Sequence, residues 1–205
     1  MGFRINTNVA SLTAQRAVAQ TNRDQQDSLQ KLSSGSRINK ASDDAAGLAI
    51  SEKMKSEIRS ARQADRNAND GISMVQVAEG GLNEVQSILT RLRELAVQSA
   101  SDTVGDTERG FTNMEYQNLV QELDRISQVT EFNGHKLLNG QGEKLDFQIG
   151  TKADAAGNQI SYEVGSVNAS SAELGIEGAE VSSKDGARNS LETVDKAIEK
   201  VSGQR

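Results

Sequence analysis

The chain contains no cysteine and no proline, and only 3% of its residues are aromatic. Without cysteine, neither a disulfide framework nor a thiolate metal site can form. Without proline, the residue that most often ends a helix is missing. Only 35% of the residues are apolar, so there is little material for a large globular core. Because a helix in a coiled coil buries only one stripe, these absences favour long helices over a compact globule.

Several classes of protein are disfavoured by the same composition. No run approaches the roughly 18 apolar residues of a membrane-spanning helix, so we expect no membrane insertion. The N-terminal residues Met1 to Asn6 form no apolar segment of the kind that secretory signal peptides carry. A formal net charge of −6 argues against a nucleic-acid partner. If the protein leaves the cell, a route other than a cleavable signal peptide must carry it.

The strongest pattern is a helical stretch from about Asp43 to Gln98, in which apolar residues recur at steps of three and four. This is the spacing of a coiled-coil seam. The seam residues are Val75, Ala78, Leu82, Val85, Leu89, Leu92 and Ala96. A looser series with one slip of phase precedes them: Met54, Ile58, Ala61, Ala64, Ala68 and Ile72. At 1.5 Å per residue such a helix would be roughly 80 Å long, which predicts an elongated rod.

Polar residues predict where this helix begins, and glycines mark points at which it could be weakened. Ser42-Asp43-Asp44 predicts its N-terminus, where short polar and acidic side chains suit the free N–H groups. The two carboxylates could suggest a metal site, but no further ligand has matching spacing, so capping is the favoured interpretation. Gly71 and Gly80-Gly81 lie inside the helix and each glycine costs about 0.5–1 kcal/mol relative to alanine. They either allow another backbone to come close or mark a real break, and composition leaves both open.

Residues 1–34 predict a weak helix, which we interpret as an N-terminal assembly arm. Its apolar residues are few, and polar side chains interrupt their series; those of the candidate arm surface are Ile5, Val9, Leu12, Leu29 and Leu32. Because packing supplies most helical stability, we expect the arm to be ordered only against other chains. A frayed terminus without a role is the alternative. Residues 35–43 form a connector.

The remaining residues, 44–205, predict a helical rod domain with one departure into β-structure. A second helix, about 107–130, follows a short polar turn and should run antiparallel to the first. Its apolar face carries Tyr116, Leu119, Leu123, Ile126 and Thr130. Alternating residues then predict a β-hairpin at about 143–167. Asn189 and Glu192 resemble a helix cap, and a third helix begins there and is cut at 205, which suggests a fragment. The fold class is therefore mainly α: an elongated antiparallel coiled-coil bundle with a small β-hairpin.

Catalytic chemistry is not indicated. His135 is the single histidine and lies beside the turn signal Asn133-Gly134. No metalloprotease, phosphate-loop, dinucleotide or nucleophile-elbow motif occurs. We expect no catalytic, cofactor-binding or metal-binding residues, no cofactor and no enzymatic activity.

Several motifs together resemble bacterial flagellin, the subunit of the flagellar filament. They are Ile5-Asn6-Thr7-Asn8-Val9-Ala10-Ser11-Leu12, Leu32-Ser33-Ser34-Gly35, Asp43-Asp44-Ala45-Ala46-Gly47-Leu48-Ala49-Ile50, Arg66-Asn67-Ala68-Asn69-Asp70-Gly71-Ile72-Ser73, Arg93-Glu94-Leu95-Ala96-Val97-Gln98 and Phe132-Asn133-Gly134. The resemblance covers 1–150 closely and 160–205 more loosely. It implies helical polymerisation with other flagellin subunits into an extracellular filament for swimming.

The resemblance also implies partners. These are the flagellar export apparatus, which would carry the unfolded chain, its chaperone, and the hook-junction and cap proteins. The flagellin-sensing Toll-like receptor of animals would contact Leu89, Arg91, Leu95 and Glu115, although Thr90 stands where many recognised members carry glutamine. Leu89 also belongs to the seam, so its interpretation as core stays open. The C-terminal arm of flagellins has no counterpart before Arg205. A junction or cap protein, and an enzyme within a flagellin frame, are the alternatives.

Overall fold

The computed structural model describes residues 8–205 and is mainly α-helical, with two small antiparallel sheets. This confirms the expected fold class. The chain divides into two compact units, the first ending at Arg59 and the second comprising Ser60–Arg205. The boundary between the two units falls inside the continuous helix α2 and differs from the expected boundaries of the arm, the connector and the rod. Those expected boundaries therefore stay predictions.

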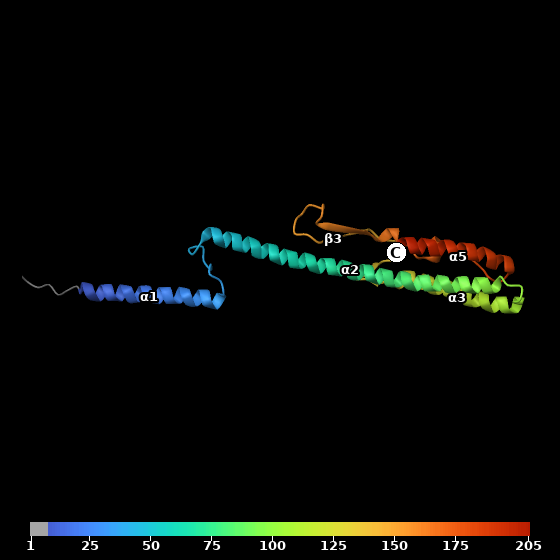
Figure 1. Cartoon of the computed structure of the whole chain (residues 1–205), viewed down its shortest axis with the longest axis horizontal. Helices are drawn as coiled ribbons and strands as arrows, with labels where there is room; N and C mark the ends of the chain where they lie inside the picture. Colours follow the sequence, from blue (N-terminus) through green and yellow to red (C-terminus); the bar gives the residue numbers. More distant parts are fainter. Residues whose placement is uncertain (1–7) are drawn as a thin grey trace, which may run out of the picture. The chain divides into compact units, whose positions relative to one another are not determined.

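The first unit holds α1 (Val9–Ser34), a connector and the beginning of α2 (Ala45–Ser99) (Figure 1). The Asn8 side chain caps α1 by accepting a hydrogen bond from the Ser11 amide. The helix ends at Gly35, whose φ of +65° is a left-handed conformation that glycine adopts without strain. The predicted helix within 1–34 is thereby confirmed for residues 9–34.

Helix α2 is continuous through Gly71 and through Gly80-Gly81. A Cβ atom at Gly81 would lie 2.6 Å from Leu138 Cδ1 and 3.0 Å from Thr130 Oγ1, so this glycine lets the following chain pack closely on the helix. A Cβ atom at Gly80 would meet nothing within 4 Å. Close approach therefore accounts for Gly81, and nothing in the structure explains Gly80.

These two glycines form a matched pair for a stability measurement. We expect Gly80→Ala to stabilise the protein by about 0.5–1 kcal/mol, because alanine has less freedom to lose in an exposed helix. We expect Gly81→Ala to destabilise it by roughly 1 kcal/mol, because the added methyl group overpacks against the buried Leu138 side chain. Urea unfolding of each variant measures both values. Equal stabilisation by both substitutions would contradict the packing role of Gly81.

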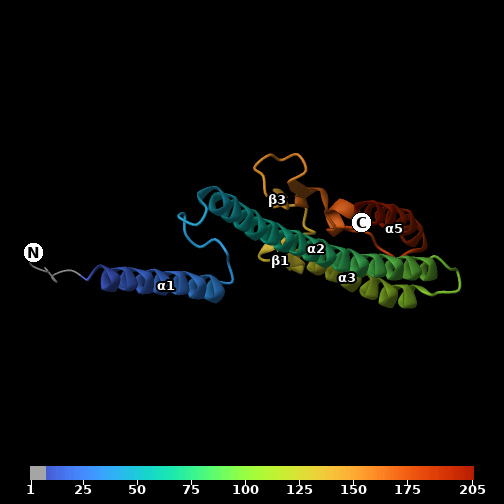
Figure 2. The ribbon, with the colours of Figure 1, turned by 60° about the vertical axis from the view of Figure 1, so that its left-hand side comes forward.

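Helix α3 (Asp106–Val129) runs back along α2 after a tight turn (Figure 2). Arg109, which the sequence analysis did not identify, stabilises that turn. Its guanidinium donates to the carbonyl oxygens of Ser99 and Ser101, both at 2.9 Å, and pairs with Asp106 at 3.0 Å. The side chain is largely buried, so its donors are satisfied inside the turn rather than in water.

Two hairpins follow α3. In the first, β1 (Glu131–Phe132) pairs with β2 (His135–Lys136) through Asn133 and Gly134, which both have positive φ. This confirms the turn predicted there and matches the hairpin turn that Asn-Gly favours. In the second, β3 (Lys144–Gln148) pairs with β4 (Gln159–Glu163) and lies within the predicted hairpin.

The second hairpin is attached to α2. The Asn67 side chain donates a hydrogen bond of 2.9 Å to the Gln148 carbonyl oxygen. The Phe147 ring packs over Gly71, where a Cβ atom would lie 3.4 Å from the ring. Because Gly71 has no side chain, the Phe147 ring can pack directly against the backbone of α2. A one-turn 3-10 helix, η1 (Val164–Ser166), ends the hairpin.

The C-terminal part comprises α4 (Ser171–Leu174) and α5 (Lys184–Gln204). The predicted cap at Asn189 and Glu192 is wrong. Ser183 caps α5 instead, by accepting from the Gly186 amide at 3.1 Å, and α5 therefore begins before residue 189. The polar and small residues that precede Asn189 hid this earlier start, because they show no apolar period.

The core of the second unit lies where α2, α3 and α5 run side by side (Figure 2). The helical seam is buried at Ala78, Leu82, Val85, Leu89, Leu92, Ala96 and Leu123, while Leu119 and Ile126 pack partly buried against it. Val75, assigned to this seam, is exposed, and Met74 is buried in its place. The phase of the pattern slips by one residue there, because Val75 faces the hairpin side of α2 rather than α3.

The looser seam of the first half of α2 is mostly uncovered. Ala64 is buried, but Met54, Ile58 and Ile72 are exposed. Within the second unit, the core formed with α3 and α5 begins on α2 at Met74, so Ile72 lies outside it.

Candidate functional surfaces

The apolar residues predicted for the arm are exposed. Val9, Leu12, Leu29 and Leu32 all lie on the surface, and Leu32 is 80% accessible. Within α1, which is described along its whole length, no residue is buried. Ile5, the fifth predicted arm residue, lies outside the described residues 8–205. The structure thus confirms that α1 is a helix and leaves its apolar side chains available to a partner.

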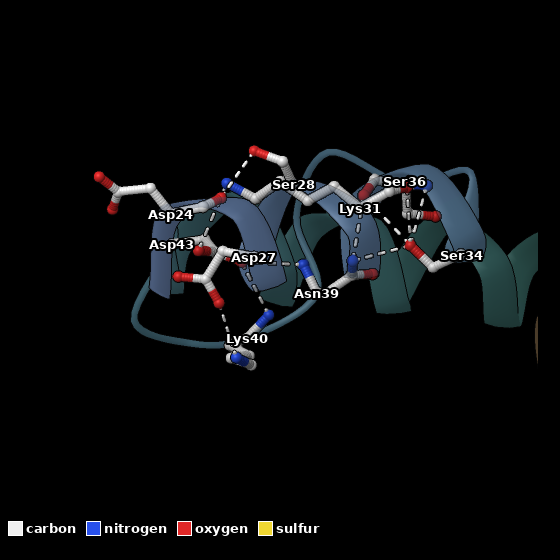
Figure 3. Close-up of polar contacts among 9 residues, drawn as sticks. All are labelled: Asp24, Asp27, Ser28, Lys31, Ser34, Ser36, Asn39, Lys40 and Asp43. Atoms are coloured by element: carbon white, nitrogen blue, oxygen red, sulfur yellow. Dashed lines mark hydrogen bonds and ion pairs between the residues drawn. The ribbon is translucent and has the colours of Figure 1, made fainter. Parts of the chain in front are cut away.

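A polar cluster defines the connector after α1 (Figure 3). The Asp43 carboxylate accepts hydrogen bonds from the Asn39 and Lys40 amides at 3.2 and 3.1 Å and lies 3.8 Å from Lys31 Nζ. Lys40 pairs with Asp27 of α1 at 3.2 Å. Asp44, not Asp43, caps α2, since its side chain accepts from the Gly47 amide at 2.9 Å. The two adjacent carboxylates therefore have structural roles, as the capping interpretation proposed.

Asn39 completes this connector cluster from the other side. Its side-chain amide donates to Ser34 Oγ at 2.7 Å and to the Ser36 carbonyl oxygen at 3.2 Å. The Ser34 hydroxyl lies in the last turn of α1, so the loop is fastened to the helix that precedes it (Figure 3). The connector is consequently a folded loop with its own hydrogen bonds.

The hydrogen bonds from the Asn39 and Lys40 amides, and then the charges of Lys31 and Lys40, lower the pKa of Asp43 below its ordinary value of 3.8. A lowered pKa means that the carboxylate stabilises the connector above pH 3.8 and that this contribution is lost as pH falls through the folded-state pKa. We expect the amide proton shifts of Asn39 and Lys40 to titrate together with a midpoint below 3.8. An NMR titration measures this midpoint. In the Asp43→Asn variant these shifts should no longer titrate, and a wild-type midpoint at or above 3.8 would contradict the folded connector.

The residues predicted as a receptor surface divide into exposed and buried members. Arg91 and Glu115 are exposed and join α2 to α3, with Arg91 Nη2 at 2.8 Å from Glu115 Oε1. Arg91 also pairs with Glu94 at 2.9 Å. Leu89 and Leu95 are fully buried in the core of the second unit. Leu89 and Leu95 cannot contact a receptor directly and could only hold the exposed residues in position through the packing of the core. Arg91 therefore does not share an exposed face with Leu95.

Hydrogen bonds to Glu115 and Glu94 raise the pKa of Arg91, so its charge is fixed in this network. Thr90 is exposed, and its hydroxyl donates to the Gln86 carbonyl oxygen of the preceding turn at 2.9 Å. Two helices thus display one cation and two carboxylates at a defined place on the surface.

Across residues 8–205 no group of three or more histidine, aspartate or glutamate side chains could hold a metal ion. Among the described helices none has an apolar stretch that could cross a bilayer.

An open cavity of about 350 Å³ lies between α2 and the β3–β4 hairpin, with a lining that is almost wholly apolar. Its residues include Ile72, Val75, Phe147, Ile160 and Tyr162.

Comparisons with known proteins match almost the whole chain. A family model described as the bacterial flagellin N-terminal helical region matches residues 5–143. Over 201 residues the sequence is 40% identical to a flagellin of Halalkalibacterium halodurans, covering 98% of this chain and 73% of that protein. It is 41% identical over 216 residues to a flagellar filament core protein of Brachyspira hyodysenteriae, covering 98% and 74%.

Other relatives are longer than this chain. Flagellin A of Vibrio cholerae is 48% identical over 156 residues, which cover 76% of this chain and 41% of that protein. The crystal structure of Bacillus cereus flagellin superposes with a TM-score of 0.59 at 27% identity, covering 68% of this chain and 78% of that one. Comparison of the sequence and comparison of the structure therefore both match flagellins.

Proposed function

Because the chain belongs to the bacterial flagellin family, whose members are structural proteins of the flagellar filament and not enzymes, we propose that it polymerises helically with further copies of itself. Contacts between two different surfaces of identical subunits do not close on themselves and so generate a filament. The filament would be extracellular and would serve swimming.

The exposure of the apolar side chains of α1 is the observation that carries this proposal. A helix whose leucines and valines are all accessible gains little from packing within its own unit. Covering those side chains with neighbouring copies would remove apolar surface from water and stabilise the helix at the same time. Exposed Ile50, Met54 and Ile58 extend the available surface into the first turns of α2.

Electron microscopy and sedimentation of the full-length protein test the polymerisation. We expect long filaments that pellet and whose mass grows with protein concentration above a critical value. Short rings or discrete adaptors that do not elongate would favour the junction or cap protein instead. A strictly monomeric full-length protein, with or without added filament seeds, would contradict the proposal.

We also propose that the subunit is exported unfolded through the flagellar secretion apparatus, escorted by a chaperone, and added beneath a cap beyond the hook junction. One feature of the sequence supports this route: the absence of cysteine and proline removes disulfides and slow prolyl isomerisation from refolding. Deleting the export apparatus of the producing cell should retain the protein inside the cell. Undiminished release from such cells would exclude this route.

We propose further that the monomer is recognised by the flagellin-sensing Toll-like receptor. The exposed ion-pair network of Arg91, Glu94 and Glu115 supports this proposal, since it presents fixed charges on two adjacent helices. Leu89 and Leu95 would hold these helices in place from the core. Activation of receptor-bearing reporter cells by the purified monomer is the direct measurement.

A further inference from the structure

The open apolar cavity beside the β3–β4 hairpin is not filled by any described side chain of this protein. Ile72, Val75 and Ile160 lie at its mouth with about half of each side chain exposed, and the rings of Phe147 and Tyr162 line it. A volume of about 350 Å³ and an apolar lining suit a bulky hydrophobic group. Such a concentration of exposed apolar side chains marks an interaction site.

A matching projection lies at the other end of the second unit. Phe111 is 64% exposed on α3, and Met114, one turn further along, is exposed as well. Residues three apart on a helix are neighbours on its surface, so the two side chains form one apolar projection. Nothing in the core requires Phe111 at this position, since the buried face of α3 carries Thr112, Tyr116 and Val120.

One copy cannot fill its own cavity with this projection. The cavity lies at Ile72 of α2, whereas α3 returns beside the end of α2 and places Phe111 near the level of Val97. At 1.5 Å per residue, the two places are roughly 40 Å apart along α2, far beyond the reach of a side chain. A Phe111 side chain that fills this cavity must therefore come from another molecule.

We propose that the Phe111–Met114 projection of one copy inserts into the Ile72–Phe147–Ile160 cavity of the next copy. The inference rests on the proposed polymerisation and names one contact within it. Because the projection and the cavity are different surfaces of one subunit, each contact leaves one of each free at the two ends. A shift of roughly 40 Å along α2 per copy follows, and the contact repeats without closing.

The absence of cysteine in the native chain makes a direct test possible. Phe111→Cys and Ile160→Cys are prepared in separate batches of the full-length protein, mixed, polymerised and treated with an added oxidant. A disulfide needs Cα atoms within about 7 Å, so we expect a cross-linked dimer only in the mixed filaments. Filaments of either single variant should give none, because equivalent residues would lie roughly 40 Å apart. Val129→Cys, exposed elsewhere on α3, replaces Phe111→Cys as the control and should not cross-link to Ile160→Cys.

A second measurement applies if the paired variants polymerise poorly. The single Ile160→Cys variant is treated with a maleimide as monomer and as filament, and we expect at least about tenfold slower labelling in the filament, because burial removes the thiol from reagent. Phe111→Ala should raise the critical concentration roughly 10- to 100-fold, since one large side chain loses its buried site. Two results together would overturn this contact while leaving polymerisation intact: variant filaments that give no mixed cross-link, and equal labelling rates of Ile160→Cys in monomer and filament. Failure of the wild-type protein to form filaments would overturn both.

Discussion

Replacing both Leu29 and Leu32 with serine is expected to abolish filament growth at concentrations where the wild-type protein polymerises. Both side chains are exposed in α1, so their loss takes nothing from the packing of the first unit. Burying one leucine in an assembly contributes about 1.5–3 kcal/mol, and two therefore contribute roughly 3–6 kcal/mol. That difference raises the critical concentration at least about 100-fold. Sedimentation across a concentration series measures it.

The control for this prediction is a double substitution on the same helix, Gln26→Ser and Gln30→Ser. It reproduces the lower helix propensity of serine without removing apolar surface. Thermal unfolding of the second unit, residues 60–205, should be the same in all three proteins. If the leucine and glutamine variants raised the critical concentration equally, helix propensity and not burial would limit assembly, and the arm would lose its proposed role.

Heptad spacing predicted the helices of this protein but not the contacts that lie outside them. The seam from Ala78 to Ala96 is buried as expected, because a period of three and four has a single physical explanation in a helix. The core also includes Leu137, Leu138, Ile176 and Val181, which lie in turns and loops. No period marks such residues. Their burial follows from where the chain returns to the bundle, which local spacing does not encode.

Helix ends and glycines also divide into features set by neighbouring residues and features set by residues far apart in the sequence. Asn8 and Gly35 obey capping rules whose groups are neighbours in sequence, although the sequence analysis did not name Asn8 as a cap. The role of Gly81 depends on Leu138 and Thr130, far along the chain, so the sequence left its two interpretations open. Arg109 was missed for a similar reason. An arginine in a helix is usually solvated, and only the turn geometry shows that its donors are used internally.

The proposed receptor residues could be placed on a helix from the sequence, but not assigned to its faces. Arg91 and Leu95 are four residues apart, which predicts a shared face. In the structure α3 and α5 cover a wide arc of α2, and Leu95 falls inside that arc whereas Arg91 falls at its edge. A helix that packs against two neighbouring helices buries more than a narrow seam. The packing of α5, in addition to α3, therefore explains why Leu95 is buried.

Leu89→Ala is expected to destabilise the second unit by roughly 2–5 kcal/mol, because it removes a fully buried side chain and leaves a cavity among α2 and α3. Arg91→Ala should change thermal unfolding little, since exposed ion pairs contribute little to stability. Both variants are expected to lower receptor activation, but for different reasons. Unfolding curves and reporter assays on the same preparations separate them.

The comparison becomes decisive when the assay temperature is lowered until Leu89→Ala is as fully folded as the wild-type protein. Receptor binding by Leu89→Ala should then return, because its contribution acts through the fold, whereas Arg91→Ala should stay deficient. Glu115→Gln, which keeps the shape of the partner and removes its charge, should resemble Arg91→Ala in binding and in unfolding. A folded Leu89→Ala that still fails to bind would mean that α2 opens on recognition and exposes its core. A fully active Arg91→Ala would instead remove the Arg91–Glu115 network from the recognition surface and leave it as an ordinary pair of solvated charges.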